Sequence, residues 1–134
     1  MTKTHQPKKI LLVEDDAALH DAFGMVLGSA GYIVDSAYDG KQALEHVAET
    51  NYDMILLDLL MPVMDGKTFL QQFDNAAHTP IIVFSNLDAK SDIDEALSLG
   101  ATRYMLKAWA SPRDLVKLVG DTLGRDNKST SSVG

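Results

Sequence analysis

Residues 54–66 read MILLDLLMPVMDG, and this stretch indicates how the chain folds. Its first four residues are apolar and are followed at once by Asp58. A short apolar run that ends at a charged residue, before a loop with Pro62 and Gly66, is typical of a buried strand in a parallel sheet. The stretch therefore predicts a strand over residues 54–57 with an acidic side chain at its carboxyl end.

Similar apolar runs recur along the chain, and segments with helical spacing lie between and after them. The apolar runs are residues 10–13, 32–34, 54–57, 81–84 and 104–106. The helical stripes are Leu19, Phe23, Val26 and Leu27; Ala43, Leu44 and Val47; Phe69, Leu70 and Phe73; Ile93, Ala96 and Leu97; and Leu115, Leu118 and Val119. Because strands alternate with helices through short connections, the sequence predicts a doubly wound α/β fold with a five-stranded parallel sheet and five helices.

Several helix ends are marked by residues that favour caps. Ser111, Pro112 and Asp114 are the residue types expected at the N-cap, the first position and the third position of a helix. Gly31 and Gly100 stand where C-terminal caps are expected.

Length and charge limit the kind of protein this is. The chain has 134 residues, a formal net charge of −7 and no cysteine. We expect one domain over residues 9–124, between a flexible N-terminal arm (residues 1–8) and a flexible tail or linker stub (residues 125–134). The acidic balance argues against direct binding to nucleic acid. The absence of cysteine and of an apolar run long enough to cross a bilayer favours a cytoplasmic protein with no membrane contact.

Polar side chains follow four of the predicted strands, at the point where each strand ends: Glu14 and Asp15, Asp58, Ser85, and Lys107. Because the carboxyl ends of parallel strands meet at one edge of a sheet, we expect these side chains to lie close together. Three neighbouring carboxylates repel one another unless a cation lies among them, and carboxylate ligands suit Mg²⁺ or Mn²⁺. With a lysine and a hydroxyl nearby, the set has the parts needed to hold a phosphoryl group, with an aspartate as its acceptor. Asp16 is interpreted instead as a helix N-cap.

Four motifs stand in order along the chain: KILLVEDD (residues 9–16), DLLMPVMDG (58–66), PIIVFS (80–85) and GATRYMLK (100–107). Together they resemble the receiver domain of bacterial two-component response regulators, over roughly Lys9 to Leu123. The resemblance implies a flavodoxin-like sheet with strand order 2-1-3-4-5. It also implies that Asp58 accepts a phosphoryl group from a histidine kinase or a phosphotransfer protein.

The resemblance further implies roles for the other site residues. Asp15 and Asp58 would bind Mg²⁺ together with the backbone carbonyl of Leu60, and Glu14 would act largely through a bound water.

By the same resemblance, Ser85 and Lys107 would contact phosphoryl oxygens, and Tyr104 would change its rotamer as Ser85 is drawn inward. The signal would leave through the fourth helix, the fifth strand and the fifth helix. Its recipient would be a downstream protein or an output domain absent from this chain.

Leu60 and Leu87, two residues beyond Asp58 and Ser85, depart from the family pattern, which often has polar residues at these positions. Ala108 is another departure, because it follows Lys107, where the family usually has proline after a cis bond. A cis bond before a residue other than proline costs about 3 kcal/mol. We therefore predict a trans bond between Lys107 and Ala108, with the following loop rerouted.

The four histidines, His5, His20, His46 and His78, show no metal-ligand spacing. We interpret all four as surface residues, as most histidines without a partner are.

A phosphoacceptor of this kind assists its own phosphoryl transfer but is not a turnover enzyme. Three alternatives to this interpretation stay open. A phosphatase with an aspartyl nucleophile typically needs a second acid two residues on, where this chain has Leu60. A mononucleotide-binding protein would need a loop rich in Gly, Ser and Thr after the first strand, whereas this loop is acidic. A docking module that works without phosphorylation is the third alternative, because Ala108 departs from the family pattern.

Overall fold

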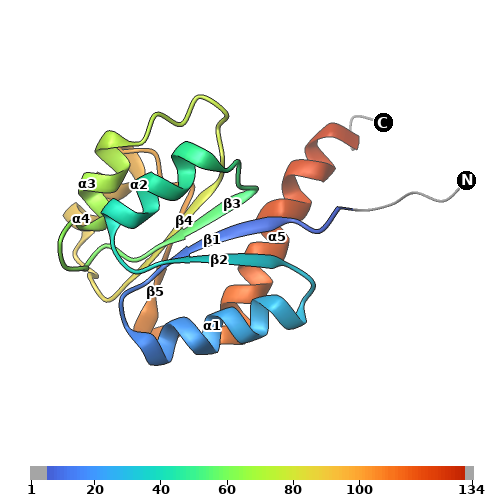
Figure 1. Cartoon of the computed structure of the whole chain (residues 1–134), viewed down its shortest axis with the longest axis horizontal. Coiled ribbons are helices and arrows are strands. Elements are labelled where there is room, and N and C mark those ends of the chain that lie inside the picture. Colours follow the sequence, from blue (N-terminus) through green and yellow to red (C-terminus); the bar gives the residue numbers. More distant parts are fainter. Residues whose placement is uncertain (1–5, 132–134) are drawn as a thin grey trace, which may run out of the picture.

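Across residues 6–131, which the computed structural model describes, five strands alternate with five α-helices (Figure 1). The strands are β1 (Lys9–Val13), β2 (Ile33–Ala37), β3 (Met54–Leu57), β4 (Ile81–Ser85) and β5 (Arg103–Leu106). The helices are α1 (Ala17–Ser29), α2 (Gly40–Glu49), α3 (Gly66–Gln72), α4 (Lys90–Ser98) and α5 (Pro112–Ser131), with a 3-10 turn, η1 (Lys107–Trp109), before α5. All strand pairs are parallel, in the order β2-β1-β3-β4-β5. The predicted fold class and strand order are confirmed.

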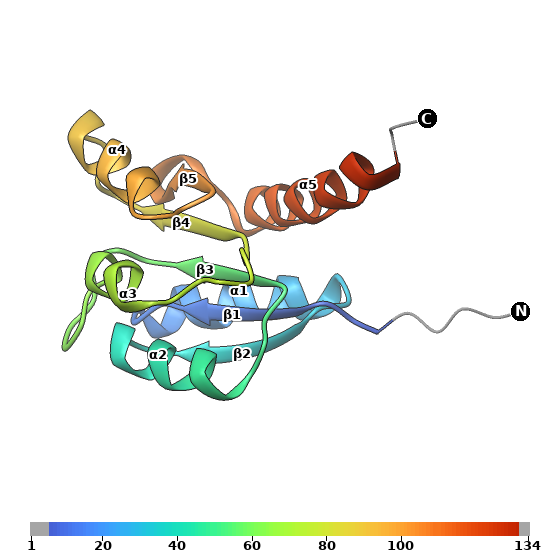
Figure 2. The ribbon, with the colours of Figure 1, turned by 90° about the horizontal axis from the view of Figure 1, so that it is seen from above.

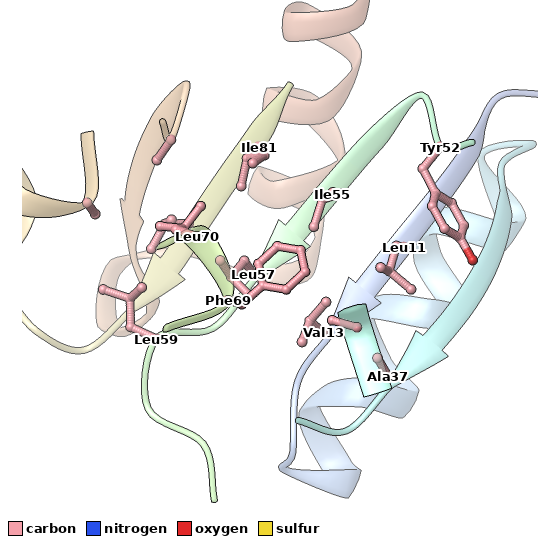
Figure 3. Close-up of a cluster of buried hydrophobic side chains, with 14 residues drawn as sticks. Leu11, Val13, Ala37, Tyr52, Ile55, Leu57, Leu59, Phe69, Leu70 and Ile81 are labelled. Carbon is pink, nitrogen blue, oxygen red and sulfur yellow. The ribbon is translucent and has the colours of Figure 1, made fainter. Parts of the chain in front are cut away.

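Each face of the sheet has its own apolar core, because successive strand residues point to opposite faces. Leu11, Val13, Ile55 and Leu57 pack on the side of α2, α3 and α4, in the cluster that Figure 3 shows. The strand residues that alternate with these point to the opposite face. Leu12 is one example, and it packs on the side of α1 and α5 together with the β3 residues on either side of Ile55. Figure 2 shows the helices on both sides of the sheet, as a doubly wound fold requires.

The two edge strands are less buried than their sequences predicted. The three central strands are almost wholly buried, whereas β5 is only partly buried along its length and Ile33 of β2 is 44% exposed. An edge strand has a neighbour on one side only, so a continuous apolar run does not guarantee burial on both faces. Leu97 of α4 is likewise 41% exposed, although its spacing assigned it to the core stripe.

The predicted helix caps are confirmed. The Ser111 N–H donates to the Asp114 carboxylate over 3.0 Å, and the Asp114 N–H donates to the Ser111 hydroxyl over 3.2 Å. Asp16 caps α1 by accepting a hydrogen bond from the Leu19 N–H over 3.0 Å. Gly31 and Gly100 have positive φ values of 101° and 118°, a backbone conformation that glycine adopts without strain.

His20 was predicted on the surface and is buried instead. It shares the buried stripe of α1 with Phe23 and Leu27, and its ring stacks on Tyr38 with 4.6 Å between the centroids. Positions 20, 23 and 27 have the three-to-four-residue spacing of a helix core face, so the helix places this side chain inward whatever its polarity. Of the other histidines, His46 is half-buried and His78 is exposed, while His5 lies outside the described residues.

Helix α5 continues to Ser131, past the end near Gly124 that the sequence predicted. The residues that follow Gly124 include no proline, so nothing in the backbone forces the helix to end there. Two predictions stay predictions: the limits of the receiver domain at residues 9–124, and the flexibility of both ends. Residues 1–5 and 132–134 lie outside the described residues.

The peptide bond between Lys107 and Ala108 is trans, as predicted, and no bond within residues 6–131 is cis. The segment after Lys107 forms the 3-10 turn η1. Within the same residues, the helices are all too short or too polar to cross a membrane.

Candidate functional site

Strand register brings the two buried acids of the site together. Val13 pairs with Leu57 across β1 and β3, and the Asp58 N–H donates to the Val13 carbonyl over 3.0 Å. Glu14 and Asp58 therefore leave adjacent strands side by side. Ser85 ends β4, and Lys107 follows β5 directly, so all the predicted strand-end residues lie at the carboxyl edge of the sheet.

Lys107 joins the two buried carboxylates. Its ammonium nitrogen lies 2.8 Å from Glu14 Oε1 and 3.0 Å from Asp58 Oδ2. Glu14 is fully buried and Asp58 nearly so, whereas Asp15 is exposed at the mouth of the site. Three residues that are far apart in sequence thus form one ionic cluster.

Backbone amides hold the second oxygen of each buried carboxylate. The Asp16 N–H donates to Glu14 Oε2 over 2.9 Å, and the Leu60 N–H donates to Asp58 Oδ1 over 3.2 Å. The Leu60 side chain itself is 55% exposed. The sequence did not predict these contacts, because every residue except proline has an N–H and no residue type marks the one that turns toward the site.

Burial shapes the pKa values of the cluster. Burial raises the pKa of Glu14 to about 6, although hydrogen bonds from Lys107 and the Asp16 backbone oppose the change. Burial also raises the pKa of Asp58 above its usual value, again against Lys107. Burial would lower the pKa of Lys107, but its contacts with Glu14 and Asp58 outweigh burial and raise it. The site thus keeps a protonated lysine beside two carboxyl groups that are costly to ionise.

The donor set fits a divalent cation that prefers oxygen ligands. One carboxylate oxygen from each of Glu14, Asp15 and Asp58 can be chosen so that all three lie within 4.8 Å of one another. Three ionised carboxylates beside the single ammonium of Lys107 leave two net negative charges. A hard cation such as Mg²⁺ would offset that charge, and the acidic cluster is able to bind one.

Ser85 and Tyr104 meet at the backbone of Leu87. Ser85 is fully buried, and its hydroxyl oxygen accepts a hydrogen bond from the Leu87 N–H over 3.2 Å. The Tyr104 hydroxyl donates to the Leu87 carbonyl over 2.6 Å. The loop after β4 therefore connects the two residues predicted to act as a switch, through hydrogen bonds to the Leu87 backbone that sequence reasoning did not predict.

Comparison with known proteins shows which family the chain is similar to. The family model of the response regulator receiver domain matches residues 10–120. The probable transcriptional regulator ycf27 of Porphyridium aerugineum is 34% identical over 127 residues, which cover 95% of this chain and 52% of that protein. The transcriptional regulatory protein ResD of Bacillus subtilis is 33% identical over 130 residues, covering 97% of this chain and 53% of that protein. The chain thus spans about half the length of the curated relatives it matches.

Solved structures show the same arrangement of elements. The CheY-like receiver domain protein from Methanospirillum hungatei has a TM-score of 0.85 at 26% identity, covering 92% of this chain and 99% of that one. The receiver domain of the Francisella response regulator 1452 has a TM-score of 0.81 at 30% identity, covering 89% and 98%. With the family match and the strand-end cluster, these similarities show that the chain belongs to the receiver domain family of two-component response regulators.

Proposed function

We propose that this receiver domain accepts a phosphoryl group on Asp58 and passes the signal on through protein contacts. Receiver domains are signalling domains and not turnover enzymes, and the homologous response regulators act with histidine kinases. The observation that supports the proposal most strongly is the position of Asp58, buried at a strand end with Lys107 3.0 Å away. A carboxylate held beside a cation at an open sheet edge suits the acceptance of a phosphoryl group.

In the proposed reaction, a carboxylate oxygen of Asp58 forms a bond to the phosphorus of the donor. The bond from phosphorus to the donor's leaving group breaks, and the leaving group keeps that electron pair. The product is an acyl phosphate on Asp58. Lys107 and the Ser85 hydroxyl are the groups we expect to contact the transferred oxygens, because both lie at the same sheet edge.

Glu14, Asp15 and Asp58, with the backbone carbonyl of Leu60, are the groups that would hold Mg²⁺. When bound, the ion would neutralise negative charge shared by the carboxylates and the phosphoryl oxygens. The three carboxylates have the hard oxygen donors and the spacing that this role needs.

The phosphoryl donor in this proposal is a histidine kinase or a phosphotransfer protein. The signal would leave through α4, β5 and α5, because the Tyr104 hydroxyl of β5 reaches the Leu87 carbonyl in the loop that leads to α4. A downstream protein, or an output domain absent from this chain, would receive it. The net charge of −7 favours protein contacts over direct contact with nucleic acid.

The test is incubation with acetyl phosphate and Mg²⁺, followed by intact-protein mass spectrometry. We expect the wild type to gain one phosphoryl group and Asp58→Asn to gain none. Asp74→Asn is the matched control, because Asp74 is exposed and lies just after α3, away from the strand-end cluster. It should be phosphorylated like the wild type.

Two results would contradict the proposal. A gain of mass that persists in Asp58→Asn would place the acceptor elsewhere. No gain in the wild type with acetyl phosphate or a phosphohistidine donor would favour the docking module that works without phosphorylation.

A further inference from the structure

The start of α2 touches the loop that connects the phosphoacceptor strand to α3. Gly40, the first residue of α2, is buried, and its N–H donates to the Met64 carbonyl over 2.8 Å. Asp39 caps the same helix by accepting a hydrogen bond from the Gln42 N–H over 2.8 Å. The position of Gly40 is thus fixed by its own helix as well as by the loop opposite.

This contact leaves no room for a side chain at position 40. A Cβ atom there would lie 2.7 Å from the Met64 carbonyl oxygen and 3.0 Å from the Asp65 carbonyl oxygen. The Met64 Cγ would also be close, at 2.8 Å, but the two carbonyl oxygens belong to the backbone, so rotation of a side chain cannot relieve the whole clash. Gly24, inside α1, is the opposite case, because a Cβ there would meet nothing within 4 Å.

The loop that Gly40 touches has a strained backbone. Val63 has a φ of 67°, which is rare for a β-branched residue, inside a tight turn closed by the Met64 N–H and the Pro62 carbonyl over 2.7 Å. Its side chain is 81% exposed, so packing does not hold it in place. Strain of this kind persists only where the surroundings impose it, and the Gly40 contact at Met64 is directly next to it.

The same loop begins at the site. The Leu60 N–H holds Asp58 Oδ1, and at the far end of the loop the Gly66 N–H donates to the Leu59 carbonyl over 3.0 Å. Met64 therefore lies in a short segment that is tied by hydrogen bonds to Asp58 at its start and to Leu59 at its end.

We infer that Gly40 is a positioning residue. Because it has no side chain, α2 can pack against Met64, and this contact holds the loop in the conformation that orients Asp58 and Leu60 toward Mg²⁺. The inference rests on the proposed function, since it concerns the metal and phosphoryl site at Asp58. Gly40 acts through the loop and does not contact the reacting atoms.

The test is the Mg²⁺ dissociation constant of Gly40→Ala, measured by calorimetry and by amide NMR on the metal-free protein. We expect the constant to rise by about tenfold, as is common when groups that orient metal ligands are lost. Phosphorylation by acetyl phosphate should be slow at low Mg²⁺ and approach the wild-type rate at saturating Mg²⁺. Because Mg²⁺ binds the folded state, a partly unfolded variant would show the same dependence, so both constants are compared under conditions where urea denaturation finds metal-free Gly40→Ala fully folded.

Gly24→Ala is the matched control, since it adds the same methyl group in open space and should leave the dissociation constant unchanged. If Gly40→Ala does not fold alone, it is made in the Gly24→Ala background, where alanine favours the α1 helix. In the wild type, the Gly40 amide resonance should shift with Mg²⁺ at the same midpoint as that of Leu60.

Unchanged Mg²⁺ affinity in Gly40→Ala, or a Gly40 resonance that ignores Mg²⁺ while Leu60 responds, would overturn the inference and leave the proposed function intact. Absence of Mg²⁺ binding in the wild type would overturn both.

Discussion

The two ends of the central sheet bury polar groups in different ways. At the amino end, polar groups are paired locally: the Tyr52 hydroxyl donates to Asp35 over 2.6 Å, and Asn75 makes hydrogen bonds of 2.9 and 2.8 Å with the backbone of Thr79. At the carboxyl end, Glu14 and Asp58 share one ammonium, that of Lys107. Figure 3 shows Tyr52 at one end of the apolar cluster and Leu59, directly after Asp58, at the other.

The polar groups at the amino end stabilise the fold, whereas those at the carboxyl end serve the proposed function at some cost in stability. Paired hydrogen bonds stabilise the fold because each donor meets its acceptor inside the chain. Like charges gathered in a buried site oppose folding, and burial accordingly raises the pKa values of Glu14 and Asp58. The carboxyl end therefore keeps an unbalanced negative charge that a cation from outside the chain can offset.

Among the substitutions that test this comparison, Lys107→Met should change the unfolding free energy most. In Lys107→Met, the two buried carboxyl groups lose the cation that pairs with both of them, so the unfolding free energy of the metal-free protein should fall by about 3 kcal/mol near neutral pH. Urea denaturation with and without Mg²⁺ measures it, and Mg²⁺ should restore part of the loss. At lower pH the loss should shrink, because the carboxyl groups then bind protons, with the pKa of Glu14 already raised to about 6.

The control for Lys107→Met is Lys90→Met. Lys90 pairs with Asp94 over 2.7 Å at the surface of α4, where solvent screens the charges. It should change the unfolding free energy very little. Equal losses in the two variants would show that burial of the cluster has no special cost.

At the amino end, Tyr52→Phe should have a smaller effect. It removes the hydroxyl that donates to Asp35 but keeps the ring in the core, and should lower the unfolding free energy by about 1 kcal/mol. Urea denaturation measures this, and calorimetry should find the Mg²⁺ affinity unchanged. A change in Mg²⁺ affinity would mean that the two ends of the sheet are coupled and would break the comparison.

His20 provides the smallest test, because it is a buried polar group outside both ends. Burial lowers its pKa below the ordinary 6.5, so the folded protein resists its protonation. Its contribution to stability is present above about pH 6.5 and should fall as the pH drops below that value, when the unfolded chain binds the proton more readily.

His20→Phe keeps the stacking on Tyr38 and cannot be protonated. Thermal denaturation between neutral and mildly acidic pH should therefore show a smaller loss of stability in this variant than in the wild type. The same loss in both proteins would place the acid sensitivity in other groups, such as the carboxyl cluster.

Much of the fold was predictable because its signals are local. The run at residues 54–57 is a strand at those positions, and the Ser111 and Asp114 cap is formed by two residues close in sequence. The gathering of Glu14, Asp58, Ser85 and Lys107 was also predictable, since parallel strands place their carboxyl ends together.

The predictions that were wrong concern burial, which depends on neighbours far away in sequence. The apolar runs of β2 and β5 resemble those of the central strands, and only the sheet order places them at its edges. His20 was assigned to the surface by its polarity, although its spacing with Phe23 placed it on the core stripe of α1.

The sequence by itself determined the alternation of strands and helices, the parallel sheet and the set of acids at its edge, because these follow from hydrophobic periodicity and from the chemistry of single residues. Only the tertiary structure decided which nitrogen reaches which carboxylate, how Leu87 joins Ser85 to Tyr104, and why position 40 is a glycine. The reason is that the Met64 carbonyl that excludes a side chain there belongs to a loop remote in sequence.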